Sequence, residues 1–192
     1  TPDKALEILK AGNTRFAANK PLRRNLKAQV QTTALGQFPF ASVVGCIDSR
    51  AAPELVFDQG VGDLFVARVA GNTVNEDILG SLEYASKVAG SRLVVVLGHT
   101  GCGAVLAALS DDHADGHLGE LTGEVADRLI EVVGADPVRA TGANLDATVH
   151  ALRAMPTLAT PAGHAPFVVG LLYDMATGEV AVTDDAGLLD EG

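Results

Sequence analysis

Two short apolar runs, each ending in reactive side chains, constrain this chain more than any other feature. The run at residues 40–46 ends in Cys46, and Asp48 and Arg50 follow at alternate positions. Alternate side chains of an extended backbone project from the same side. A second run, residues 93–97, is followed by His99 and Cys102 among glycines. Two thiols, an imidazole and a carboxylate suit tetrahedral zinc, so the two strand ends predict one zinc site.

Apolar runs that alternate with helical periodicity predict the fold class. We expect an α/β domain whose mostly parallel central sheet has about four parallel strands plus an antiparallel edge strand, flanked by helices. Ligands of such sheets bind beyond the carboxyl ends of the strands, which is where both motifs lie. The expected strands are residues 40–46, 64–69, 93–97, 167–173 and 179–183. The expected helices are residues 2–18, 53–57, 76–89 (with Thr73 and Glu76 as a capping box), 104–109, 118–132 and 144–155.

The chain of 192 residues reads as one domain, residues 1–192, with an N-terminal helical arm over residues 1–35. The helix that begins at Pro2 has nothing local to pack on, so it must lie across another part of the fold or a second subunit. Basic residues cluster in this arm, and we interpret them as a solvated face. They are Arg15, Lys20, Arg23, Arg24 and Lys27.

Charge and hydropathy exclude some functions. A formal net charge of −10 opposes a sequence-independent grip on nucleic-acid phosphates. No apolar run approaches the ~20 residues of a membrane helix, and no signal peptide is visible. We therefore expect no nucleic-acid or membrane partner and a cytoplasmic protein, or a periplasmic one if a leader was removed before Thr1.

The two motifs could also form a purely structural zinc site, closed by two cysteines, His99 and Asp48, that only holds the fold together. Arg50 argues against it, because an arginine fork can hold a carboxylate at two points. A carboxylate that can form an ion pair with an arginine is able to leave the metal. Water can then occupy the vacated coordination position.

The segments 46–50 (Cys-Ile-Asp-Ser-Arg) and 99–103 (His-Thr-Gly-Cys-Gly) resemble the β-class carbonic anhydrases. The resemblance covers roughly the first 110 residues and thins in the second half, apart from residues 172–174. It also includes residues 9–16, 54–60, 62–68, 70–72 and 81–85.

The resemblance implies one zinc ion per chain, held by Cys46, His99 and Cys102. Asp48 is expected either as the fourth ligand or, paired with Arg50, as the acceptor that orients a zinc-bound hydroxide. That hydroxide attacks carbon dioxide, so the implied reaction is the reversible hydration of carbon dioxide to bicarbonate and a proton.

The family also implies a carbon dioxide pocket and a partner. The positions that match the pocket are Gln37, Phe65 and Tyr84, with Tyr84 contributed by a neighbouring subunit. The expected assembly is a homodimer or a homotetramer, which would give the N-terminal helix a surface to pack on.

Two alternatives stay open. The same zinc site could hydrolyse CS₂ or COS, which are isoelectronic with carbon dioxide and which the ligand residues cannot separate from it. A non-catalytic zinc module that senses bicarbonate or redox state is less well supported, since a sensor has no need of Asp48, Arg50 and Gln37. His113 and His117 could carry protons, but we interpret both as solvated loop residues.

Overall fold

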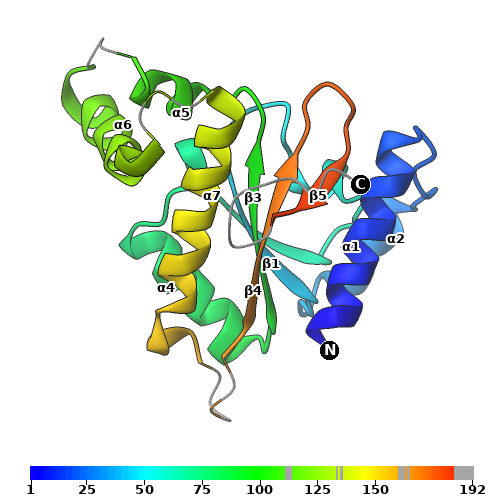
Figure 1. The fold of residues 1–192 in the computed structure, drawn as a ribbon. Coiled ribbons are helices and arrows are strands. Elements are labelled where there is room, and N and C mark those ends of the chain that lie inside the picture. Colours follow the sequence, from blue (N-terminus) through cyan, green and yellow to red (C-terminus); the bar gives the residue numbers. More distant parts are fainter. Residues whose placement is uncertain (111–113, 133, 135, 160–162, 164, 184–192) are drawn as a thin grey trace.

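The computed structural model describes residues 1–110, 114–132, 134, 136–159, 163 and 165–183. Its centre is a five-stranded sheet in the order β2-β1-β3-β4-β5, in which the first four strands are parallel and β5 is antiparallel to β4 (Figure 1). The predicted fold class is therefore confirmed. The strands are β1 (Ala41–Gly45), β2 (Leu64–Arg68), β3 (Leu93–His99), β4 (Phe167–Tyr173) and β5 (Val180–Val182).

Helices cover both faces of the sheet: α1 and α2 lie on one side, and α4 and α7 lie on the other (Figure 1). No helix of the described part of the chain is long and apolar enough to cross a membrane. The α-helices are α1 (Pro2–Ala17), α2 (Leu26–Thr33), α3 (Pro53–Val56), α4 (Glu76–Glu83), α5 (Gly103–Ala108), α6 (Gly116–Arg128) and α7 (Pro137–Arg153). Shorter turns are η1 (Ala70–Asn72), η2 (Tyr84–Val88, a π-helix), η3 (Ile130–Val132) and η4 (Pro156–Leu158).

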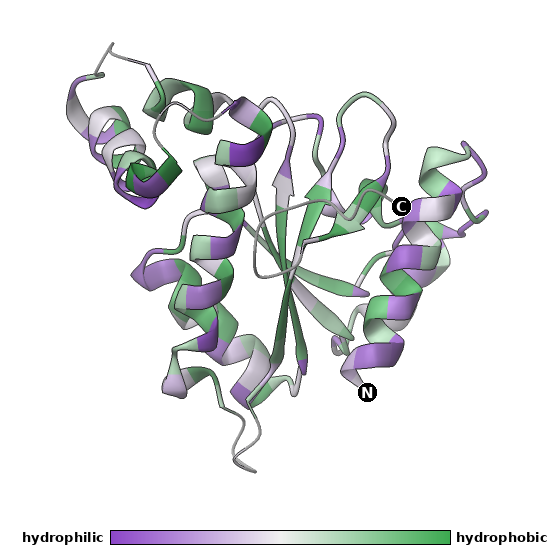
Figure 2. Cartoon of the chain, in the orientation of Figure 1, coloured by the Kyte–Doolittle hydropathy of each residue, from purple (hydrophilic) through white to green (hydrophobic). Residues whose placement is uncertain are grey.

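Successive strand residues point to opposite faces, so the sheet separates two apolar cores. Val43 and Val95 pack with Leu9 of α1, whereas Val44 and Val96 pack on the other side with helices α4 and α7. All four valines are fully buried, as expected for a parallel sheet that is covered on both faces. The strands of the sheet are largely hydrophobic along their length (Figure 2). This rigid double-faced packing fixes the strand ends that carry the reactive side chains.

Helix α1 packs on its own chain. Thr1 caps it by accepting a hydrogen bond from the Lys4 amide, and Leu9 is fully buried. The Asn13 side chain donates to Val56 O at 3.1 Å and Gly178 O at 2.8 Å. The surface that this helix needs is thus supplied by the sheet and by the turn that precedes β5.

Helix α2, by contrast, has no buried residue, and its bounds were not predicted within the helical arm of residues 1–35. Asn25 caps it by accepting from the Ala28 amide at 3.0 Å. The arm and the segment between it and β1 carry a set of apolar side chains that are more than half exposed. They are Leu22, Leu26, Val30, Leu35 and Phe38. That the arm packs on a partner subunit stays a prediction.

Two helix starts differ from expectation. Helix α7 begins at Pro137, seven residues before the expected position, and Asp136 caps it by accepting from two backbone amides. Its first turns bury small residues, so they carry no apolar periodicity. The predicted capping box of Thr73 and Glu76 is wrong, because Asn75 caps α4 by accepting from Ile78 N at 3.0 Å.

The basic residues of the arm are only in part a solvated face, which corrects our interpretation. Arg15 and Arg24 both form ion pairs with the buried carboxylate of Asp58, which also accepts from Leu22 N at 3.1 Å. Burial alone would raise the pKa of Asp58, but these hydrogen bonds outweigh it and lower the pKa. Asp58 thereby ties the arm to the end of α3.

Candidate metal centre

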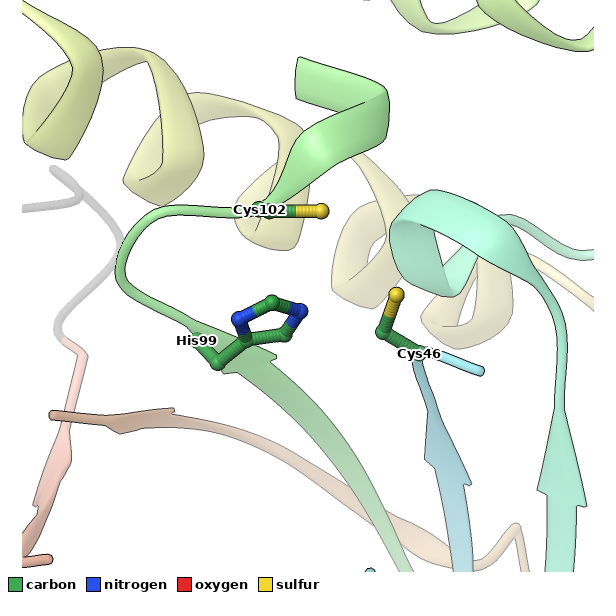
Figure 3. Close-up of side chains that lie close together, drawn as sticks. All are labelled: Cys46, His99 and Cys102. Carbon is green, nitrogen blue, oxygen red and sulfur yellow. The ribbon is translucent and has the colours of Figure 1, made fainter. Parts of the chain in front are cut away.

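The carboxyl edge of the sheet brings Cys46, His99 and Cys102 together (Figure 3). Cys46 directly follows β1, His99 is the last residue of β3, and Cys102 precedes the first residue of α5. The ligand atoms of these three buried residues all lie within 4.8 Å of one another. Sequence reasoning therefore identified a real cluster, because parallel neighbouring strands end at the same edge.

The orientation of the His99 ring suits a metal ligand. Its Nδ1 lies 3.0 Å from Thr100 O, and because a carbonyl oxygen can only accept, Nδ1 must carry the proton. Nε2 is fully buried and has no hydrogen-bond partner among the described residues. The lone pair of Nε2 is therefore free for a metal, with the ring held from behind as in many metal sites.

The two thiols are unequal. A hydrogen bond from Cys102 lowers the pKa of Cys46 to about 4, against the opposing effect of burial, and two backbone amides add to the lowering. The same pairing with Cys46, together with burial, raises the pKa of Cys102. The hydrogen bond between the two sulfurs thus favours ionisation of one of the two thiols. A metal bound by both sulfurs would displace the proton that the pair retains.

Asp48 is turned toward Arg50 and is not part of the ligand cluster. Arg50 Nε lies 2.9 Å from Oδ1 and Nη2 lies 2.7 Å from Oδ2, and the Arg50 amide also donates to Oδ1. These hydrogen bonds hold the pKa of Asp48 well below its usual range. Within the described residues, three side chains that could hold a metal ion remain, and catalytic zinc sites have three protein ligands and one open position.

Arg68, the last residue of β2, holds the loop that carries these groups, and sequence reasoning missed this role. Its Nε donates to Cys46 O at 2.7 Å and its Nη2 donates to Asp48 O at 2.6 Å. The register of the sheet, which sets Arg68 beside Gly45, brings the guanidinium to the loop. An arginine at the carboxyl end of a neighbouring strand was the only available sequence signal.

The three predicted pocket residues do not meet in one chain. The rings of Phe65 and Tyr84 stand edge to face with centroids 6.2 Å apart, and both line a groove of about 700 Å³ between β2 and α4. Gln37 is exposed and precedes β1, whereas Cys46 follows it, so the two lie at opposite ends of that strand. Within one chain Gln37 cannot reach the cluster, and its role in a pocket stays a prediction.

Of the two histidines considered as proton carriers, the structure describes His117, which is not part of the cluster. His117 lies in the first turn of α6 instead of in a loop, is exposed, and pairs with Glu120 at 3.0 Å. His113 falls outside the described residues.

Comparison with known proteins agrees with this geometry. The model of the carbonic anhydrase family matches residues 41–180, which is more than half of the chain. The chain belongs to the β-carbonic anhydrase family. The family match spans the two cysteines, His99 and the Asp48–Arg50 pair.

Individual relatives extend the likeness beyond that core. Carbonic anhydrase 2 of Mycobacterium tuberculosis is 37% identical over 99% of this chain and 97% of its own length. The β-carbonic anhydrase CafA of Aspergillus fumigatus has the same fold, with a TM-score of 0.74 over 96% of this chain and 91% of that chain at 24% identity. A structure from Sordaria macrospora, described as a tetrameric β-carbonic anhydrase, has a TM-score of 0.71 over 81% of this chain and 89% of that chain at 23% identity.

Proposed function

We propose that this chain catalyses the reversible hydration of carbon dioxide to bicarbonate and a proton, with one zinc ion held by Cys46, His99 and Cys102. The observation that carries the proposal is the combination of a buried three-ligand cluster with an aspartate that an arginine holds away from it. Membership of the carbonic anhydrase family supports the same activity.

The donor set fits zinc, since thiolate sulfur and imidazole nitrogen are its usual protein ligands. When bound, zinc supplies Lewis acidity that makes water a nucleophile near neutral pH. Two thiolates offset the charge of the ion more than three histidines would, so acidification by the metal alone is weaker. Such a site benefits from a protein group that orients the nucleophile.

Asp48 is that group in our proposal. Arg50 keeps Asp48 ionised and fixes its plane, so an oxygen lone pair is available to accept a hydrogen bond from the nucleophilic water. Accepting this bond turns the oxygen lone pair of the water toward the substrate. The groove that Phe65 and Tyr84 line includes none of the three cluster residues, so in our proposal these rings come from a neighbouring copy. They would supply an apolar wall that suits an uncharged molecule such as carbon dioxide.

Stopped-flow hydration of carbon dioxide, followed with a pH indicator, tests the proposal on protein loaded with zinc and on the same protein stripped by a chelator. We expect activity only in the loaded sample, and its return when zinc is restored. Equal rates in both samples would refute the proposal. The same samples are assayed with CS₂, because faster turnover of CS₂ than of carbon dioxide would favour the alternative hydrolase.

We also propose that a second copy of this chain completes the site. Strand β2 is an edge of the sheet, its residues are only partly buried, and the arm beside it carries the exposed apolar side chains of α2 and its flanks. Phe38, next to Gln37, is 91% exposed. An apolar arm and an open sheet edge in one chain suit association with another copy. Sedimentation equilibrium distinguishes a dimer from a tetramer, and a monomer at micromolar concentration would contradict the proposal.

The compartment is the last part of the proposal. Both cysteines are free and buried. Thiols of a metal site stay reduced most readily in the cytoplasm, so we propose that compartment.

A further inference from the structure

Two side chains of α7, one helical turn apart, form hydrogen bonds with consecutive backbone carbonyl groups of η1. Asn144 Nδ2 donates to Gly71 O at 2.8 Å, and Thr148 Oγ1 lies 3.2 Å from Asn72 O. Both side chains are fully buried. Helix α7 belongs to the half of the sequence where the resemblance to the family thins, and none of its residues is a metal ligand in the proposed function.

The η1 turn approaches the metal centre at Gly71. The η1 turn that follows β2 lies beside the Cys46 side chain (Figure 3), and its Gly71 amide is among the groups that lower the pKa of that thiol. Gly71 adopts a φ of 69°, and a Cβ there would lie 3.1 Å from a methyl of Val125 and 3.2 Å from Ala104 Cβ. A glycine is therefore required by both backbone and space, and a glycine by itself does not restrict its own torsion angles.

We propose that Asn144 is a positioning residue of the metal centre, which holds Gly71 so that its N–H stays directed at the Cys46 sulfur. The inference rests on the proposed zinc site. A hydrogen bond to a coordinating thiolate orients the sulfur and withdraws part of the charge that it donates to the metal, so losing the bond alters both affinity and electronic structure.

The chemistry of the Asn144 side chain supports a role beyond packing. Its Oδ1 is buried and has no hydrogen-bond partner among the described residues, so the amide is only partly satisfied. A half-satisfied buried amide is costly, and packing alone would favour an apolar residue of similar size beside Leu145. At this position the side-chain amide of Asn144 forms a hydrogen bond to Gly71 O.

The test compares Asn144→Leu with Thr148→Val, which are both near-isosteric and both remove one buried hydrogen bond between α7 and η1. Zinc affinity is measured by competition with a chromophoric chelator, and the thiolate-to-metal charge-transfer bands are recorded after loading with Co²⁺. We expect Asn144→Leu to weaken zinc binding by about 10-fold or more, the range known for partners of metal ligands, and to shift the bands. Thr148→Val removes the contacts of the hydroxyl with Asn72 O, Asn144 O and Arg128 Nη1 but leaves the side-chain bond from Asn144 to Gly71 O in place. It is expected to leave both readouts near those of the unmodified protein.

Thermal unfolding of each variant shows whether affinity is measured on folded protein. If Asn144→Leu does not fold, Asn144→Ser, which is smaller but too short to reach Gly71 O, takes its place. The proposal is wrong if an Asn144 variant lowers the melting temperature while zinc affinity and Co²⁺ bands stay unchanged, or if Thr148→Val alters them equally. A failure of the proposed function would look different, since the unmodified protein would then bind no zinc or show no hydration activity.

Discussion

Arg50 holds both carboxylate oxygens of Asp48, with Nε 2.9 Å from Oδ1 and Nη2 2.7 Å from Oδ2. The arginine side chain is 62% exposed, whereas that of the aspartate is only 16% exposed. The pair therefore reaches from solvent to the edge of the buried cluster. Asp48 cannot turn toward a metal there without giving up two charge-assisted hydrogen bonds, so the pair favours an open fourth position.

Replacing Arg50 with alanine tests this relationship. Without the fork, Asp48 is free to bind the metal and block water, so we expect turnover to fall by roughly 10²-fold or more while zinc stays bound. Carbon dioxide hydration and zinc content by atomic absorption measure the two effects. Arg139→Ala, which removes an exposed arginine of α7, serves as the matched control. A near-normal rate in Arg50→Ala would mean that the pair has no role in turnover.

Replacing Cys102 with serine removes one sulfur from the cluster. A hydroxyl is a much poorer zinc ligand than a thiolate, so we expect zinc content and hydration activity to be lost together. The loss should appear as metal-free but folded protein, which circular dichroism and metal analysis distinguish from unfolding. Activity that survives in metal-free Cys102→Ser would contradict the assignment of the site.

Mixed dimers locate Gln37 relative to the site that it serves. One protomer carries Gln37→Ala and an intact cluster, and the other carries Cys102→Ser and an intact Gln37. If Gln37 acts on the site of the partner, each mutant homodimer is impaired and the mixed dimer regains up to half of the normal activity. A mixed dimer no more active than the two parents would place Gln37 outside the partner's site.

Asp58 makes stability depend on pH. Its pKa is lowered in the folded protein, so its contribution is fully present above the unfolded value of about 3.9 and is lost as pH falls through the lower, folded value. We expect Asp58→Asn to reduce the free energy of unfolding at pH 7 by about 2 kcal/mol or more, because ionic hydrogen bonds to two arginines are weakened.

Chemical denaturation at pH 7 and at several values below pH 4 measures this effect, and the difference between Asp58→Asn and the unmodified protein should shrink at the acidic end. Glu7→Gln is the control, because the Lys4–Glu7 pair is more than half exposed on both sides. Its effect should not exceed about 1 kcal/mol. A constant difference at all pH values would show that Asp58 does not carry the dependence.

The sequence was sufficient for the sheet and for the cluster of Cys46, His99 and Cys102 because both follow from local patterns. Buried strands are apolar runs, and parallel strands deliver their carboxyl ends to one edge, so Cys46, His99 and Cys102 could be placed together without coordinates. The Asp48–Arg50 pair was equally accessible, since residues two apart on an extended chain share a side.

The parts that could not be predicted depend on distant contacts or on weak periodicity. Asp58 meets Arg15 and Arg24 only after the arm has folded back, and no spacing in the sequence signals that meeting. Asn144 reaches Gly71 across 73 positions of the chain. Helix α2 buries nothing in this chain, so it lacks the apolar stripe by which helices are recognised.

The attachment of β3 to β4 has a consequence for how the protein is made. His99 lies beside Tyr173 in the sheet, and the Thr100 amide donates to Tyr173 O at 3.0 Å. All three residues of the cluster leave the ribosome well before β4 does, yet the strand end that carries His99 gains its neighbour only when β4 arrives. Pairings so distant in the chain are slow to form. A nascent chain therefore exposes two thiols and an imidazole without the complete sheet edge that orders them until β4 has been made.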